Sequence, residues 1–292
     1  MKNTLYIFSL FIFLIGCTEP IEIKTNDSEP VIVIYGVLTD VLEQQSVRIT
    51  RSAPYFSNEP NPAVSGAEVI ITSSEGDEFQ LFENVKNPGT YFSENKWAAQ
   101  SGVYYTLNVN VDFNRTGIID NYQASTIFAP TVFLDSIKIV PIHIMGHFNH
   151  ALNIYGQDSE AEEYYLFRVL VNDSLATTML SQYLLTDDIM FNGQYIDGLT
   201  INYYGDISEW ETDSEEQRRN SIYLQAGDKV EVKISSIPKA YYDFIIQCQN
   251  QMRGENPMFG GPASNISTNI SNGGVGFFTG YCTSSITTEV KE

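Results

Sequence analysis

Three histidines in the middle of the chain are the residues whose type and spacing best suit chemistry. His143, His147 and His150 are the only histidines of the protein, and they stand in the stretch HIMGHFNH. Three neutral imidazoles suit zinc, copper or haem iron. A helix would align them on one face, but the nearby proline, glycine and asparagine favour a strand end and a loop. The sequence leaves a metal or haem site open and favours a polar loop with exposed imidazoles.

Other arrangements that could support catalysis are incomplete. The chain has no G-x-S-x-G elbow, no P-loop and no G-x-G-x-x-G motif leading from a strand into a helix. Its acidic runs, including residues 209–216, lack the glycine-containing calcium loop pattern and are interpreted as solvated surfaces. Carboxylate pairs for glycoside hydrolysis can be imagined in many places among 36 acidic residues. We therefore predict no catalytic residue and no cofactor.

The beginning of the chain has the layout of an export signal. A lysine precedes an apolar run that is too short for a membrane-spanning helix of about 20 residues. The run ends in Leu-Ile-Gly-Cys17, which resembles the bacterial lipobox, where the cysteine is acylated and becomes the mature N-terminus. We expect residues 1–16 to be a lipoprotein signal peptide and Cys17 to carry the lipid. Residues 17–30 then form a polar tether above the membrane.

The composition is strongly acidic and excludes one class of partner. The chain has 36 Asp and Glu against 16 Lys and Arg, which gives a formal net charge of −20. Such a surface repels nucleic acid and anionic lipid headgroups. We expect no nucleic-acid partner, and contact with the membrane through the lipid anchor.

Two further cysteines allow a disulfide. Cys248 and Cys282 are the cysteines that remain besides the acylation site. An exported chain passes through an oxidising compartment, where these two thiols can pair. Two separately buried thiols would give the same sequence, so both interpretations stay open.

Alternation of apolar and polar residues predicts β-strands along most of the chain. It is clear in VIVIYGVL, SVRIT, AEVIIT and YYTLNVNV, which are separated by turn sequences such as EGDE and NPGT. We predict an immunoglobulin-like or transthyretin-like β-sandwich over residues 31–128. Residues 129–292 are predicted to form a second β-rich domain with one amphipathic helix near residues 239–253. The apolar stripe of this helix consists of Tyr241, Phe244, Ile245, Cys248 and Met252.

The glycine-rich stretch near the C-terminus has two interpretations. Gly273–Gly274 fits a turn with positive φ, while Gly276 and Gly280 would let a strand bend or let another backbone approach closely. The alternative is a partner surface formed by the aromatic side chains of Phe277, Phe278 and Tyr281.

Several of these stretches resemble known families. VSGAEVIIT, NPGTYF and GVYYTLNV are similar to small sandwich modules found beside carboxypeptidases and on TonB-dependent receptors. The lipobox, the sandwich, the helix and the stretch NPMFGGPASNISTNISNGGVGFFTGY together resemble a family of uncharacterised Bacteroidota-type lipoproteins, a domain of unknown function, over roughly residues 17–288. The resemblance implies genes beside TonB-dependent outer-membrane receptors and supplies no catalytic residues. Ser136 and Ser174 stand in stretches that resemble the D-[ST]-aliphatic motif of O-glycosylation in Bacteroidota.

The resemblance implies an outer-membrane lipoprotein that is not an enzyme and assists a TonB-dependent receptor. Its ligand, a small molecule, a peptide or a glycan, is not identified by the sequence. One alternative is a surface hydrolase of glycans or peptides, and a second is a lipoprotein that captures haem or metal through the three histidines. Acidic residues soon after Cys17 and the two glycosylation motifs favour the extracellular face over the periplasmic face.

Overall fold

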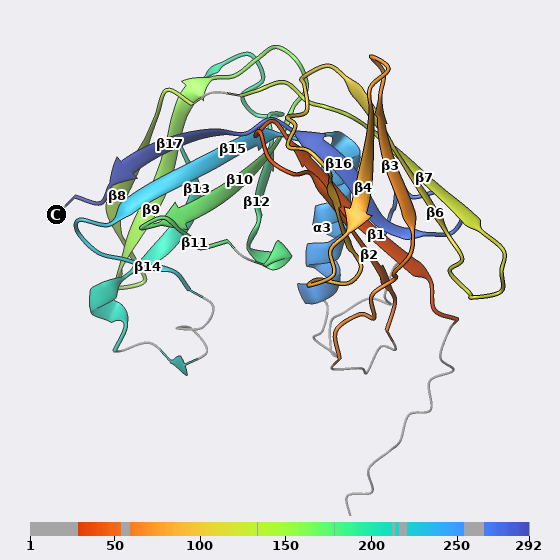
Figure 1. The fold of residues 1–292 in the computed structure, drawn as a ribbon. Coiled ribbons are helices and arrows are strands. Elements are labelled where there is room, and N and C mark those ends of the chain that lie inside the picture. Colours follow the sequence, from red (N-terminus) through yellow and green to blue (C-terminus); the bar gives the residue numbers. More distant parts are fainter. Residues whose placement is uncertain are drawn as a thin grey trace, which may run out of the picture.

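The computed structural model confirms a mainly β protein with large curled sheets in a sandwich-like and barrel-like arrangement. It describes residues 29–53, 59–132, 134–177, 179–211, 214–215, 221–253 and 266–291. The predicted signal peptide, Cys17 and most of the predicted tether lie outside the described residues. Figure 1 shows two groups of strands, here called the first and the second lobe, with helix α3 between them. No described helix is long and apolar enough to cross a membrane.

The first lobe is built on one sheet, called the first sheet, which has eight strands among the described residues. Its order is β16-β1-β2-β5-β4-β3-β6-β7. Seven strands come from the N-terminal half: β1 (Ile32–Thr39), β2 (Ser46–Arg51), β3 (Glu68–Ser73), β4 (Glu78–Glu83), β5 (Thr90–Ser93), β6 (Tyr104–Val111) and β7 (Asp120–Ile127). The remaining strand, β16 (Val275–Tyr281), comes from near the C-terminus and pairs in parallel with β1.

Alternation explains why these segments are strands and where the core lies. In β1 and β6 every second residue is buried, as the sequence pattern predicts for strands with one face covered. The covered faces meet in one apolar core that includes Ile34, Leu107 and Phe278. Trp97 closes this core and stacks on Phe79 with ring centroids 3.8 Å apart.

Residues 266–274 connect the two outer strands of the first sheet. Ser271 accepts a hydrogen bond from the backbone N–H of Gln123 in β7, at 2.7 Å, and donates its own N–H to the Gln123 carbonyl, at 2.8 Å. The side-chain amide of Asn269 bonds both the N–H and the C=O of Phe278 in β16, at 2.9 and 2.7 Å. The segment therefore curls the sheet toward a barrel by satisfying backbone groups of its outer strands.

Gly276 permits the parallel pairing of β16 with β1. Its φ is +107°, and an added Cβ would lie 2.1 Å from the carbonyl oxygen of Ile34. The predicted close approach of another backbone is confirmed at this position. The turn before β16 differs from the prediction, because its positive φ angles belong to Asn272 and Gly273 and not to Gly274.

The second lobe is a sandwich of two sheets. Among the described residues, the second sheet has the order β14-β13-β9-β8, and the third has the order β11-β10-β15-β17 with β12 also on β10. The elements are β8 (Ser136–Ile144), β9 (His147–Gln157), β10 (Tyr164–Val171), β11 (Ser174–Leu175), η2 (Leu180–Gln182), β12 (Leu184–Asp187), β13 (Tyr195–Asp206), η3 (Ile207–Glu209), β14 (Tyr223–Leu224), β15 (Lys229–Ser236) and β17 (Ser284–Glu289). Buried residues of both sheets, such as Leu152 and Val232, form the core between them.

Helix α3 (Lys239–Arg253) occupies the predicted range and joins the lobes. Tyr241 and Ile245 are buried against Tyr35 of β1, Phe277 of β16 and Leu166 of β10. The hydroxyl groups of Tyr35 and Tyr241 hydrogen-bond at 2.8 Å. Of the predicted apolar stripe, Tyr241 and Ile245 are therefore core shared by both lobes. Phe244 and Cys248 are only partly buried, and Met252 is 49% exposed, so the stripe does not continue into the core at the end of the helix.

Candidate functional site

A pocket of about 550 Å³ opens at one end of the second sheet. We call it the His147–Glu209 pocket. It is lined by β9, β13, η3 and β14 together with parts of the segment from Thr177 to Leu184. The lining includes ionisable, amide and aromatic side chains, namely those of His147, Phe148, Asn149, Tyr203, Glu209 and Tyr223.

The β8–β9 hairpin places His147 at the edge of the pocket. Its two central residues, Met145 and Gly146, have φ angles of +51° and +91°, as expected for a two-residue hairpin turn. The register sets Ile144 opposite His147. The sequence therefore puts the histidine at the first position of β9, next to the pocket.

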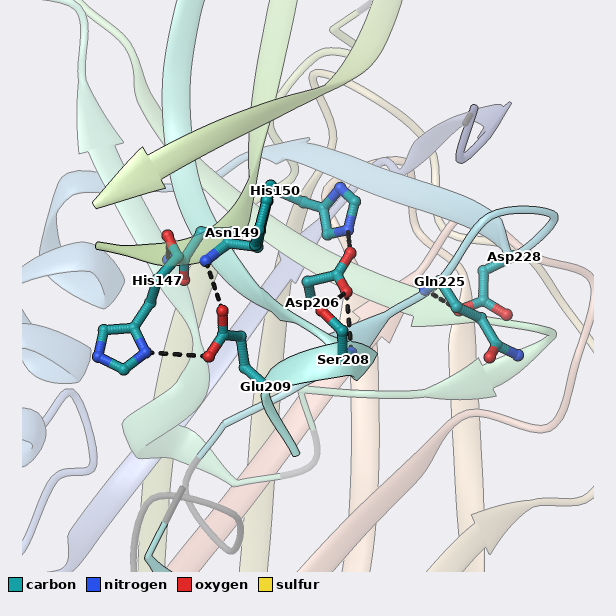
Figure 2. A network of polar contacts seen from close by, with 9 residues as sticks. His147, Asn149, His150, Asp206, Ser208, Glu209, Gln225 and Asp228 are labelled. Atoms are coloured by element: carbon teal, nitrogen blue, oxygen red, sulfur yellow. Dashed lines mark hydrogen bonds and ion pairs between the residues drawn. The ribbon is translucent and has the colours of Figure 1, made fainter. Parts of the chain in front are cut away.

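Glu209 connects the loop after β13 to this hairpin. Its carboxylate oxygen Oε2 lies 3.1 Å from Nδ1 of His147, and Oε1 accepts the backbone N–H of Phe148 at 3.0 Å (Figure 2). The Glu209 side chain is 17% exposed, although its acidic stretch is interpreted from the sequence as fully solvated. Both carboxylate oxygens are thus engaged with β9, which fixes the wall of the pocket.

Asp206 holds η3 in place and anchors a second histidine. Its Oδ1 accepts hydrogen bonds from the N–H and the hydroxyl of Ser208, at 2.9 and 2.6 Å, and thereby caps the short helix. Its Oδ2 lies 2.8 Å from Nε2 of His150 (Figure 2). Burial alone would raise the pKa of Asp206, but the hydrogen bonds from Ser208 and His150 outweigh burial and lower this pKa below its ordinary value.

At the pocket, two buried side chains on paired strands each keep one polar atom without a hydrogen bond among the described residues. His150 and Tyr204 are directly opposite in the β9–β13 pairing, and both side chains are buried. Nδ1 of His150 and the hydroxyl of Tyr204 have no hydrogen-bond partner among the described residues. Burial raises the pKa of Tyr204 to about 12, with the Asn202 side chain opposing the shift. The phenol is therefore neutral across the physiological range.

Aromatic side chains form the opposite wall. The ring of Tyr223 in β14 packs directly on the backbone of Gly205, where an added Cβ would come within 2.7 Å of the ring. Trp210 meets the same ring edge to face, with centroids 5.0 Å apart. Gly205 is the residue that allows this approach, because any side chain would displace the ring.

The three histidines do not form a metal site. His147 and His150 are three positions apart in one strand, so their side chains point to opposite faces. The ring of His143 in β8 packs instead against Phe148, with centroids 4.0 Å apart. Among the described residues no group of three or more His, Cys, Asp or Glu side chains could hold a metal ion. The interpretation as a polar loop with exposed imidazoles also needs correction. The three histidines lie in the paired strands β8 and β9, and His150 is buried and bonds to Asp206.

The predicted partner surface lies mostly inside the protein. Phe278 is fully buried in the core of the first lobe, and Phe277 is buried against α3. Tyr281 is partly buried and packs in the same interlobe cluster, where burial raises its pKa. Phe277 and Phe278 cannot meet a receptor without separation of the lobes, because one packs against α3 and the other lies in the core of the first lobe.

The cysteines and the candidate glycosylation sites lie apart from the pocket. Cys248 and Cys282 are free thiols in the described structure, the first in α3 and the second buried after β16. Ser174 is exposed beside a tight turn, whereas Ser136 is partly buried in the β8–β9 ladder.

The comparisons with known proteins define the family but not its activity. The family model for the Domain of unknown function (DUF4249) matches residues 18–287. The chain belongs to this family. A comparison of this DUF4249 chain with curated proteins gives no match.

One solved structure with some likeness is Parabacteroides merdae beta-glucuronidase. The identity is 9% and the TM-score is 0.21, over 72% of this chain and 23% of the glucuronidase chain. The DUF4249 chain thus spans less than a quarter of the enzyme's length. A likeness this weak supports no conclusion about activity.

Proposed function

We propose that this DUF4249 protein is a non-enzymatic binding protein that holds a ligand in the His147–Glu209 pocket. The supporting observation is the pocket itself, which has a volume in the range of small-ligand sites and a lining of aromatic, amide, hydroxyl and carboxylate groups. These groups come from separate elements of one packed sandwich, so the site is formed before a ligand arrives.

The hydrogen bonds around the pocket favour binding over hydrolysis. A hydrolase needs an acid, base or nucleophile that is free to reach its substrate. Both oxygens of Glu209 are bonded to β9, and both oxygens of Asp206 are bonded to Ser208 and His150. The hydroxyl of Ser208 donates to Asp206. These groups hold the architecture of the site, which is the role expected in a capture protein.

For location and partner, we propose an outer-membrane lipoprotein that is acylated at Cys17, faces the cell exterior and works with a TonB-dependent receptor. The lipobox, the acidic residues that follow it and the resemblance to receptor-associated lipoproteins support this part of the proposal. The net charge of −20 suits a surface protein that stays soluble beside an anionic membrane.

Affinity purification from detergent-solubilised outer membranes tests the partner. We expect a β-barrel receptor to co-purify with the tagged protein but not with an unrelated tagged lipoprotein. Recovery of the protein alone would overturn the receptor proposal. Proteinase treatment of intact cells tests the orientation: survival in intact cells, with degradation after lysis, would place the protein on the periplasmic side.

A further inference from the structure

The charge of the pocket lining restricts the ligands that it can hold. Of the lining residues, all within the described part of the chain, only His147 and Glu209 can carry a charge near neutral pH. These two lie 3.1 Å apart and bond to each other. An anionic ligand such as a phosphate or a carboxylate would have to compete with Glu209 for His147, the one cationic side chain among the described lining residues. A cationic ligand would have to compete with His147 and the Phe148 N–H for Glu209. The described lining residues therefore favour an uncharged ligand.

The polar groups of the lining match hydroxyl groups. Asn149 and Asn202 contribute amides, and Ser181 and Ser221 contribute hydroxyls. Each of these side chains both donates and accepts hydrogen bonds. A ligand hydroxyl has the same dual character, so a polyhydroxylated ligand can meet donors and acceptors in one small volume.

Two aromatic rings that line the pocket are about half exposed, and one of them, Phe148, also packs against His143. Tyr203 in β13 is 51% exposed and Phe148 in β9 is 48% exposed, although both line the pocket. Large exposed rings give flat apolar faces with little side-chain entropy to lose on binding. The C–H face of a sugar ring is a suitable partner, because its hydroxyls stay at the edge and remain free for hydrogen bonds.

We infer that the ligand of the His147–Glu209 pocket is an uncharged saccharide. Its ring packs on Tyr203 or Phe148, and its hydroxyls bond to Asn149 and Asn202. This inference rests on the proposed function, because it names the ligand class of the same pocket.

The test is a binding screen on the detergent-solubilised full-length lipoprotein. The panel contains neutral oligosaccharides, charged oligosaccharides, neutral and basic peptides, haem and zinc, with calorimetry for any positive compound. We expect a neutral oligosaccharide to bind and Tyr203→Ala to weaken it by about tenfold, the effect of losing one stacked ring. Tyr203→Phe retains the ring and should bind nearly as the original. Tyr104→Ala is the matched control, because Tyr104 is a similarly exposed strand residue, at 56%, in the other lobe.

The outcomes separate the inference from the proposed function. A neutral saccharide whose binding falls with Tyr203→Ala, and not with Tyr104→Ala, supports both. A peptide, a charged glycan, haem or zinc that shows the same dependence on Tyr203 overturns the saccharide inference and leaves the capture function standing. Binding of no compound, or binding that Tyr203→Ala does not change in a folded variant, overturns both.

Discussion

Gly276→Ala tests whether the C-terminal strand β16 completes the first lobe. β16 pairs in parallel with β1 over seven residue pairs, from Val33 with Val275 to Thr39 with Tyr281. A Cβ on residue 276 would lie 2.1 Å from the Ile34 carbonyl oxygen and 2.9 Å from its carbonyl carbon. Real Cβ atoms essentially never approach closer than 3.0 Å. The obstacle is backbone, so no side-chain rotation can relieve it.

Two terms set the expected loss of stability. A φ of +107° is unfavourable for alanine and costs about 1–3 kcal/mol by itself. Moving β16 away from β1 then weakens the ladder and the burial of Phe278, a side chain whose complete removal costs about 3–5 kcal/mol. We expect Gly276→Ala to lower the free energy of unfolding of the first lobe by at least about 3 kcal/mol. In urea this is a decrease of about 1–3 M in the midpoint.

Tryptophan fluorescence makes the assay specific for one lobe. The protein has two tryptophans, Trp97 in the first lobe and Trp210 in the second. In a Trp210→Phe background, urea unfolding followed by fluorescence reports the environment of Trp97. Gly273→Ala is the matched control, because Gly273 has a φ of +73° but no atom within 4 Å of an added Cβ. It should cost only about 1–2 kcal/mol. Equal midpoints for Gly276→Ala and Gly273→Ala would refute the steric argument.

Three further predictions concern the connecting segment, the interlobe tyrosines and the anchor. Asn269→Ala leaves the N–H and C=O of Phe278 without their side-chain partners, so we expect a loss of about 2–3 kcal/mol in the same urea assay; a loss under about 1 kcal/mol would contradict this role. Burial raises the pKa of Tyr35 to about 12, despite its bond to Tyr241. Between pH 10 and 12 the folded protein therefore keeps a proton that the unfolded chain loses, and stability falls as the pH rises. Tyr35→Phe should reduce this slope by up to about 1.4 kcal/mol per pH unit, and an unchanged slope between pH 10 and 12 would count against it. Cys17→Ser should move the protein from the detergent phase to the aqueous phase in a phase-partition assay; retention in detergent would show another anchor.

The strands and the helix could be predicted because their signals are local. The alternation in VIVIYGVL matches the buried and half-buried residues of β1. The predicted stripe of α3 matches its buried face at Tyr241 and Ile245 but not at Met252, which is exposed. Such periods arise from the geometry of a single element, which repeats every two residues in a strand and every 3.6 in a helix. The close backbone approach at Gly276 was predictable for a similar reason, because glycine inside a strand pattern has few other uses.

The assembly of the site had no such signal. Glu209 stands in an acidic run that looks solvated, and only the fold brings its carboxylate to Phe148, some sixty positions earlier in the chain. The spacing of the histidines suggests a cluster. In the extended strand β9, however, the side chains of His147 and His150 point to opposite faces of the sheet. A local pattern does not record which distant atom will meet a side chain.

The sequence by itself thus determined the β-rich class, a helix near residues 239–253 and the alternation of inward-facing residues in strands such as β1. Only the tertiary structure decided that β16 returns to β1, that the predicted aromatic partner surface is buried, and that a His–Glu pair lines a pocket. The physical reason is that the face which an element buries is set by the spacing of apolar residues within that element, so its own sequence shows it. The pairing of strands more than two hundred residues apart depends on the total burial and hydrogen bonding of the whole chain, and no single segment contains it.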